Sequence, residues 1–305
     1  MSTKKPPNLE ETFIEFAKNL PRAEFIDELK LDKKQREAEK ADFFFNDRQI
    51  VCELKSLRTD QMGKVDKILR PHQERPEWPI FYGGWEIHKV LRHLPDGQQI
   101  NKQIYGGVTS AIKELVRKAN HQIRTTKEMF GLSSAGGLLV ILNEYVDILS
   151  PDVIAQKVYE LYNKRTPEGE PQFPEINFTW IINVSHYTQL TPDLQGLPSL
   201  ILPNSVPDPA NVSDFVDSLQ PQWAAYNGVP MVKADWDSLD SIKFESVSQA
   251  KANSGRKMVR HEFQRMQYRR RPYLRALNRD GMVEYGRELM LNLTPGFLKG
   301  ATKRQ

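Results

Sequence analysis

Apolar residues recur with the 3.6-residue period of an amphipathic helix in several parts of the chain. The first such segment begins at Asn8 and ends before Pro21, because proline does not continue a helix. The clearest covers residues 108–130, where one side is apolar and the opposite side is rich in lysine, arginine and glutamine. The same pattern predicts shorter helices over residues 63–70, 86–93, 151–164 and 213–226.

Other apolar patterns predict strands. Residues 137–142 form a continuous apolar run after a glycine-rich turn, which is typical of a strand covered on both faces. A second strand is predicted over residues 178–184. Between residues 40 and 55, an aromatic run is followed by the turn-forming Asn46-Asp47-Arg48 and then by an alternating segment, which predicts a β-hairpin.

The predicted hairpin brings three charged side chains together. Side chains alternate across a sheet, so Glu53 and Lys55 share one face of the second strand, while Cys52 and Leu54 turn to the core. Asp42, at the start of the neighbouring strand, adds a second carboxylate at the same place. Two carboxylates suit an oxygen-preferring cation such as Mg²⁺, and a lysine beside them suits a phosphate oxygen. These groups together are able to cut a phosphodiester.

At these residues the chain resembles a known family. Asp42, a ten-residue gap and then Glu53-x-Lys55 resemble the PD-(D/E)xK motif of the restriction-endonuclease-like nuclease superfamily, with Ala41 in place of the family's proline. The resemblance implies that Asp42 and Glu53 bind Mg²⁺ or Mn²⁺ and that Lys55 is the catalytic lysine. It also implies a mixed central sheet flanked by helices, and the order hairpin, helix, buried strand agrees with that core.

Two further site positions follow from the resemblance alone. Some members of the family place a glutamine from the helix after the hairpin near the metal. Gln122 is the candidate here, with an ordinary solvated helix face as the alternative. The family usually adds a glutamate from an upstream helix, and the sequence leaves five candidates open: Glu10, Glu11, Glu15, Glu24 and Glu28.

The motif also has a simpler interpretation. Glu-x-Lys patterns occur by chance in a chain of this length, and Glu28-Leu29-Lys30 is one in surroundings that look helical. Asp42, Glu53 and Lys55 would then be the solvated face of an edge hairpin. We prefer the nuclease interpretation, because the predicted hairpin places the acidic groups on one face.

The composition narrows the class of protein. Among 305 residues there is one cysteine, no run of eighteen apolar residues and no signal-peptide pattern, which fits a cytoplasmic protein without disulfides or a membrane span. His88 and His93 are five residues apart without an accompanying Cys/His cluster, which argues against zinc. The glycine pairs beginning at residues 83, 106 and 136 do not continue into a phosphate-binding fingerprint and are expected in turns.

Positive charge is concentrated near the C-terminus. The net charge is +4, but residues 251–280 contain ten basic and two acidic residues, so the rest of the chain sums to about −4. This asymmetry points to a polyanionic partner, and arginine suits bidentate phosphate binding. We expect a long basic helix from Val247, interrupted at Pro272, with a plain surface or protein-interface helix as the alternative. Its candidate nucleic-acid-binding residues are Arg256, Lys257, Arg260, Arg265, Arg269, Arg270, Arg271 and Arg275.

The sequence therefore predicts an α/β protein with a restriction-endonuclease-like core over residues 8–190, an insertion at about 57–106 and a largely helical basic C-terminal region over 191–305. A single elaborated domain is the alternative. The expected activity is metal-dependent hydrolysis of nucleic acid, with DNA favoured over RNA, in restriction, anti-phage defence or genome maintenance. The sequence leaves open a homodimer or a partner subunit. The alternative function is an inactive nucleic-acid-binding or scaffold subunit on the same fold.

Overall fold

The structure is a computed structural model that describes residues 8–59, 61–78, 87–191, 194–209, 212–234, 244–247 and 273–276. Its strands are β1 (Glu24–Phe25), β2 (Phe43–Phe45), β3 (Ile50–Leu57), β4 (Gly136–Asn143), β5 (Phe178–Asn183), β6 (His186–Thr191), β7 (Leu194–Pro203), β8 (Met231–Ala234), β9 (Phe244–Ser246) and β10 (Tyr273–Ala276). Its helices are α1 (Leu9–Lys18), the 3-10 turn η1 (Ile26–Glu28), α2 (Lys33–Glu37), α3 (Met62–Gln73), α4 (Ile87–Leu91), α5 (Gly97–Phe130), α6 (Pro151–Tyr162) and α7 (Val212–Tyr226).

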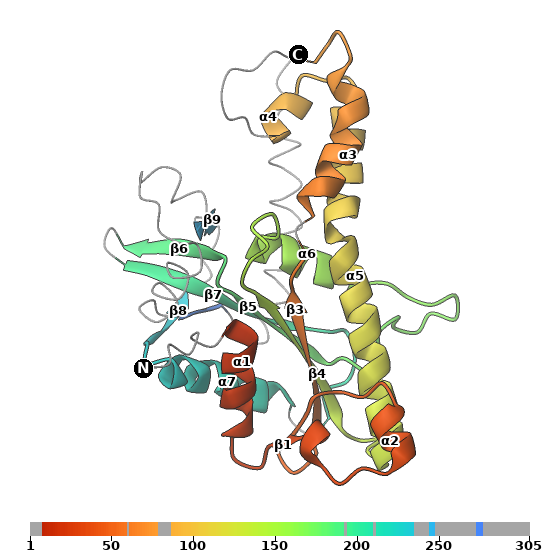
Figure 1. Cartoon of the computed structure of the whole chain (residues 1–305), viewed down its shortest axis with the longest axis vertical. Helices are drawn as coiled ribbons and strands as arrows, with labels where there is room; N and C mark the ends of the chain where they lie inside the picture. Colours follow the sequence, from red (N-terminus) through yellow and green to blue (C-terminus); the bar gives the residue numbers. More distant parts are fainter. Residues whose placement is uncertain are drawn as a thin grey trace, which may run out of the picture.

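The described strands join in one mixed sheet that helices flank (Figure 1). Its main path is β1-β2-β3-β4-β5-β7-β10-β8, with β6 beside β7 and β9 beside β6. β3, β4 and β5 are parallel, whereas β2 and β7 are antiparallel to β3 and β5. Parallel neighbours need a crossover connection, which α5 supplies between β3 and β4 and α6 supplies between β4 and β5. The predicted α/β class and mixed sheet flanked by helices are confirmed.

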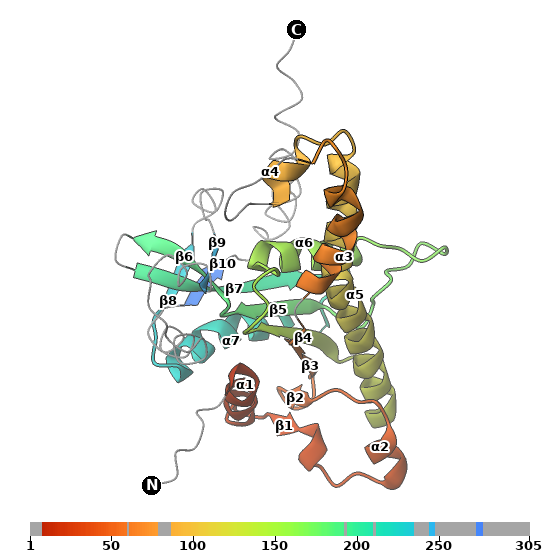
Figure 2. The same ribbon diagram turned by 45° about the horizontal axis from the view of Figure 1, so that its top comes forward.

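Helices cover both faces of the sheet. Thr179 and Trp180 follow each other in β5 and therefore point to opposite faces. The Trp180 ring packs edge-to-face on Phe13 of α1, with 5.7 Å between ring centroids, whereas Thr179 bonds to the hydroxyl of Tyr162 in α6. Figure 2 shows the same division, with α1 and α7 on one side and α6 on the other. Cover on both faces explains why all eight residues of β4 are buried and why its sequence is a continuous apolar run.

The long helix α5 begins earlier than its apolar stripe predicts. It starts at Gly97 and runs through the pair Gly106-Gly107, so the expected turn at this pair is wrong. α3 and α4 pack against its N-terminal part, and Figure 1 shows this group projecting beyond the sheet. The predicted insertion therefore supplies α3, α4 and the start of α5. None of the described helices is both long and apolar enough to cross a membrane.

The second glycine pair, Gly136-Gly137, opens β4 and is not a turn either. A Cβ atom at Gly137 would lie 1.8 Å from the carbonyl oxygen of Glu175, so only glycine allows this approach of two backbones. Asn177 ties the same segments together, since its Oδ1 accepts the N–H of Gly137 at 2.7 Å and its Nδ2 donates to the Pro207 carbonyl at 2.6 Å. The start of β4 is thus fixed by close packing and a buried amide.

Strands from beyond residue 190 continue the sheet. β10 lies between β7 and β8 and is parallel to both. The long helix expected from Val247 is therefore wrong at Tyr273–Ala276, where Arg275 belongs to a strand. Pairing with two neighbouring strands outweighs the helical pattern of the local sequence, because strand formation depends strongly on tertiary context.

Candidate active site

The turn that joins β2 to β3 has a demanding backbone. Asn46, Asp47 and Arg48 all adopt positive φ values, of 50°, 54° and 64°. Asparagine and aspartate tolerate this conformation better than other residues. Arg48 is held by contacts instead: its Nε and Nη2 donate to the two carboxylate oxygens of Glu24 at 2.7 and 2.6 Å, and its guanidinium lies over the Phe44 ring. The turn is thereby fixed to β1, which sets the alignment of β2 on β3.

Asp42 and Glu53 lie opposite each other on this hairpin. The β2–β3 pairing ends at Phe43 and Cys52; just beyond it the Asp42 N–H donates to the Cys52 carbonyl at 3.1 Å, and the Asp42 and Glu53 carboxyl groups lie close enough for each to shift the pKa of the other. Residues directly opposite in an antiparallel pair share a face. Lys55, two residues beyond Glu53, projects to that same face, and its ammonium contacts Oε1 of Glu53. The structure therefore brings together the three residues that carry the sequence motif.

The carboxyl group of Glu53 is buried in surroundings that disfavour its charged form. Its side chain is 1% exposed. Burial, and next the charge of Asp42, raise its pKa to about 8, although Lys55 acts in the opposite direction. Its Oε2 is buried and receives no hydrogen bond from the described residues. When Glu53 is ionised, a buried carboxylate oxygen without a donor is costly, and a cation at this oxygen would remove that cost.

The solvated edge hairpin that we considered as an alternative is wrong. β3 lies inside the sheet, between β2 and β4, and its residues from Ile50 to Glu53 are buried. One oxygen of Asp42, Oδ2, accepts the backbone N–H of Leu54 at 2.7 Å. Burial raises the pKa of Asp42, while the Leu54 hydrogen bond and the Lys55 charge lower it. Asp42 and Lys55 are half-buried, with 23% of the Lys55 side chain exposed, whereas Glu53 is fully buried.

The upstream glutamates lie elsewhere. Among the described residues, no group of three or more His, Cys, Asp or Glu side chains could hold a metal ion, so Asp42 and Glu53 stand as a pair. The five candidates each have another partner: Glu10 accepts from Ser56 and Arg58, Glu11 from the Asn8 N–H, Glu15 from Tyr226, Glu24 from Arg48 and Glu28 from Lys18.

Of the five upstream glutamates, Glu10 is the candidate whose pKa is lowered by the charge of Lys55. Burial raises its pKa, but hydrogen bonds from Ser56 and Arg58 and the charges of Arg58 and Lys55 outweigh burial and lower it. A pocket of about 260 Å³ opens at this point, at the ends of β3 and β4. Its lining consists of Asn8, Leu9, Glu10, Ser56, Leu57, Arg58, Leu142, Glu144 and Tyr145. None of Asp42, Glu53 and Lys55 lines this pocket, and its link to them is the charge of Lys55 acting on Glu10. No sequence pattern indicated this pocket, because α1 and β4 are far from β3 along the chain.

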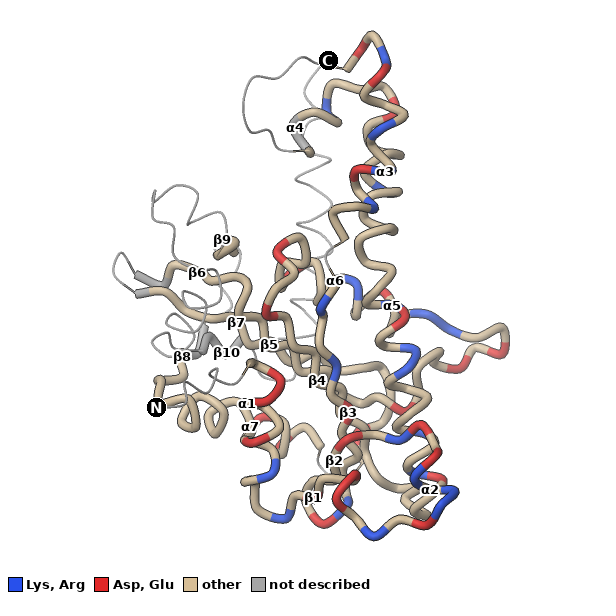
Figure 3. The backbone as a smooth tube through the Cα atoms, viewed as in Figure 1, with Lys and Arg blue, Asp and Glu red and all other residues tan. Residues whose placement is uncertain are grey.

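The basic C-terminal candidates lie almost entirely outside the described residues. Arg256, Lys257, Arg260, Arg265, Arg269, Arg270 and Arg271 fall there, and of Arg275 only its position in β10 is known. In the described part, acidic and basic residues are interspersed over the elements (Figure 3). The charge asymmetry is therefore a property of residues 251–280.

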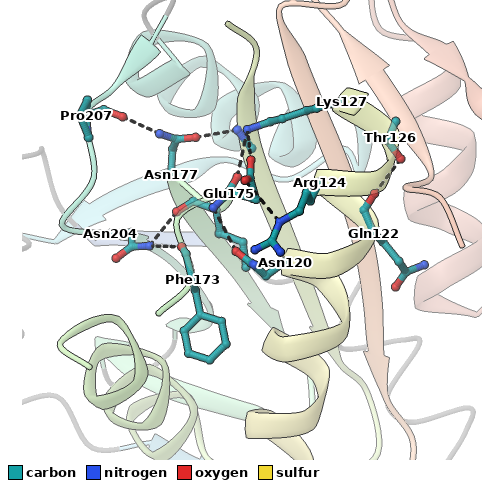
Figure 4. Close-up of polar contacts among 12 residues, drawn as sticks. Asn120, Gln122, Arg124, Thr126, Lys127, Phe173, Glu175, Asn177, Asn204 and Pro207 are labelled. Atoms are coloured by element: carbon teal, nitrogen blue, oxygen red, sulfur yellow. Dashed lines mark hydrogen bonds and ion pairs between the residues drawn. The ribbon is translucent and has the colours of Figure 1, made fainter. Parts of the chain in front are cut away.

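Gln122 contacts the backbone before the site. Its Nε2 donates to the carbonyl of Lys40 at 3.1 Å, two residues before Asp42. One helical turn further along α5, the Thr126 hydroxyl accepts the N–H of Ala41 at 2.7 Å. Figure 4 shows Thr126 beside Gln122, with its bond to the Gln122 carbonyl dashed. Sequence reasoning missed Thr126, because a lone threonine in a helix carries no motif. Its spacing of four residues from Gln122 was the available signal.

Comparisons of the chain with protein-family models, with curated proteins and with solved structures found no match. Its function therefore has to be inferred from its own residues.

Proposed function

We propose that the chain is a metal-dependent nuclease of the restriction-endonuclease-like class that hydrolyses phosphodiester bonds, with DNA favoured as substrate. The carrying observation is the pairing of Glu53 with Asp42 beside the ammonium of Lys55, with Oε2 of Glu53 buried and without a donor among the described residues. Perturbed acids of this kind cluster at functional sites.

The donor set fits Mg²⁺ or Mn²⁺. Mg²⁺ is commonly held by one or two carboxylates and completes its shell with water and substrate phosphate oxygens. Asp42 and Glu53 supply two carboxylates, and the fixed contact of Asp42 with the Leu54 N–H orients one of them in advance. When bound, the ion would activate a water molecule and neutralise charge on the phosphate.

Lys55 has a role of its own. Its ammonium is held on Glu53, yet part of the side chain reaches solvent, where a phosphate would arrive. A fixed cation at that place stabilises the negative charge that develops on the phosphate oxygens in the transition state. The order of elements also supports the proposal, since the β2–β3 hairpin, α5 and the parallel buried strand β4 follow the core order of the resembled superfamily.

The test is cleavage of plasmid, linear and single-stranded DNA and of RNA in Mg²⁺, Mn²⁺ or EDTA. We expect Asp42→Ala and Lys55→Ala to reduce metal-dependent cleavage by about 100-fold or more while nucleic-acid binding survives. Glu28→Ala and Lys30→Ala are matched controls, because Glu28-Leu29-Lys30 has the same spacing on a different segment. Unchanged cleavage in the Asp42 and Lys55 variants would refute the assignment. Metal-independent binding without any cleavage would favour the inactive binding subunit.

A further inference from the structure

We propose that Gln122 and Thr126 are positioning residues for Asp42, which they orient by holding the Lys40–Ala41 peptide unit, one residue earlier in the chain. The proposal rests on the proposed function, because the orientation of Asp42 matters only if this carboxylate binds the metal. The two side chains bond to the backbone of Lys40 and Ala41, and each acts on Asp42 through that backbone.

Both polar atoms of one peptide unit are bound by α5. The carbonyl of Lys40 accepts from Nε2 of Gln122 at 3.1 Å, and the N–H of Ala41, in the same peptide unit, donates to Oγ1 of Thr126 at 2.7 Å. A peptide unit is planar, so fixing its carbonyl and its N–H fixes the orientation of the whole unit. The unit ends at the Cα atom of Ala41, so it fixes the point from which the chain continues to Asp42, and the bond of the Asp42 N–H to the Cys52 carbonyl fixes the next peptide unit.

The Thr126 hydroxyl is itself held in place. It donates to the carbonyl of Gln122 at 2.8 Å, so its lone pair is free to accept the Ala41 N–H. Thr126 and Ala41 are both buried, with 0% and 2% exposure. In a buried place the bond to the N–H matters more, because an unpaired N–H there has no water to bond to. Figure 4 shows Gln122 and Thr126 on one side of α5, while Asn120, Arg124 and Lys127 bind the segment around Glu175 on another.

Asp42 is held from its other side as well. Its N–H donates to the Cys52 carbonyl at 3.1 Å, its carbonyl accepts from the Ile26 N–H at 2.9 Å, and its Oδ2 accepts from the Leu54 N–H. With the Lys40–Ala41 peptide unit clamped by α5, the residue has little freedom left. Metal ligands held this way bind better, since partners behind a ligand typically contribute 10–100-fold in affinity.

Alanine at position 41 is consistent with this hydrogen-bond arrangement. A proline there would fix its own φ but would have no N–H to donate. Ala41 has the N–H, and Thr126 uses it. In this chain a hydrogen bond to α5 restrains the backbone before the aspartate, where the resembled motif has a proline ring.

The experiment measures Mn²⁺ binding by the full chain and the Mg²⁺ concentration that gives half-maximal cleavage. Thr126→Val keeps the shape but removes the hydroxyl, and we expect it to weaken metal binding and raise the half-maximal Mg²⁺ concentration by about 10-fold. Gln122→Met should act in the same direction, and Thr126→Ser should restore both values. Nucleic-acid binding in EDTA should stay unchanged.

Thr109→Val is the matched control. Thr109 is buried in the same helix, and its hydroxyl likewise donates to a carbonyl four residues earlier, that of Tyr105. Equal metal affinities in Thr126→Val and Thr109→Val, or no rescue by Thr126→Ser, would overturn the positioning role. If Thr126→Val does not fold, the metal affinities of Gln122→Met and Thr126→Ser test the positioning role instead. If the nuclease proposal itself is wrong, the outcome differs from these: Mn²⁺ binding is then absent, or Asp42→Ala leaves it unchanged.

Discussion

At the scale of single residues, the protein without a metal ion holds a carboxyl group in a place that disfavours its charge. Burial and the Asp42 charge raise the pKa of Glu53 from 4.5 to about 8. The group is therefore largely protonated at neutral pH in the folded chain, whereas in the unfolded chain it is ionised. Sites that bind ligands often lower stability in this way, because groups placed for binding are not placed for folding.

This difference gives a pH-dependent prediction for Glu53→Gln. Between pH 4.5 and 8 the unfolded chain loses the proton first, so the free energy of unfolding falls as pH rises through this window. Glutamine does not ionise, so in EDTA the variant should be more stable than the wild type at about pH 8 by at least about 1 kcal/mol, with the difference shrinking toward about pH 5. Urea unfolding at both pH values measures it, and exposed Glu28→Gln is the control. A difference that does not vary with pH would contradict the assigned cause.

The sequence predicted which residues meet, but not how they are buried. Period-two alternation alone put Glu53 and Lys55 on one face, and the register then brought Asp42 opposite. Burial of Glu53 depends on cover from helices and on β4, which are distant in sequence, so no local pattern indicated it. Gln122 became a candidate only through the resemblance, which implies a glutamine from the helix after the hairpin near the metal. Its partner could not be predicted, because a backbone carbonyl such as that of Lys40 leaves no mark in the sequence.

At the scale of elements, most helices and strands were predictable and their ends were less so. Asn8 caps α1 through the N–H of Glu11, as the polar residue before an apolar stripe indicates. α5 begins well before its predicted start because α3 and α4 pack against a segment whose own stripe is weaker. The glycine pairs at 106 and 136 were misread as turns for a related reason, while the pair at 83 lies outside the described residues. Glycine marks close approach as well as turns, and only the neighbouring segment distinguishes the two.

Glycine substitutions separate these two situations. We expect Gly137→Ala to destabilise the protein by about 3 kcal/mol or more, because the added Cβ would meet the Glu175 carbonyl oxygen and force β4 away from it. Gly106→Ala is the opposite case. It lies inside α5 with nothing within 4 Å of the added atom, so alanine should stabilise the helix by up to about 1 kcal/mol. Thermal unfolding of both variants is the measurement, and a mild effect at Gly137 would mean that the two backbones separate easily.

At the scale of the whole molecule, the basic segment over residues 251–280 contributes a strand to the sheet. β10 comes from within residues 251–280 and pairs on one side with β7 and on the other with β8. The sequence did not reveal this, since parallel pairing between strands so far apart along the chain leaves no local signal. Removing the segment to test nucleic-acid binding would also remove β10, which joins β8 to the rest of the sheet, so loss of binding would not identify the contacts.

Charge substitution avoids this difficulty. We expect Arg269→Gln/Arg270→Gln to weaken nucleic-acid binding and to reduce the slope of log K against log salt concentration by up to about 0.9 for each phosphate that the arginines neutralise. Lys33→Gln/Lys34→Gln removes the same charge from the exposed helix α2 and should leave that slope close to the wild-type value. Thermal unfolding of both variants controls for stability. Counterions are released only at phosphates that a bound cation neutralises. Equal slopes in the two double variants would therefore mean that nucleic acid responds to the net charge of the protein and not to Arg269 and Arg270 in particular.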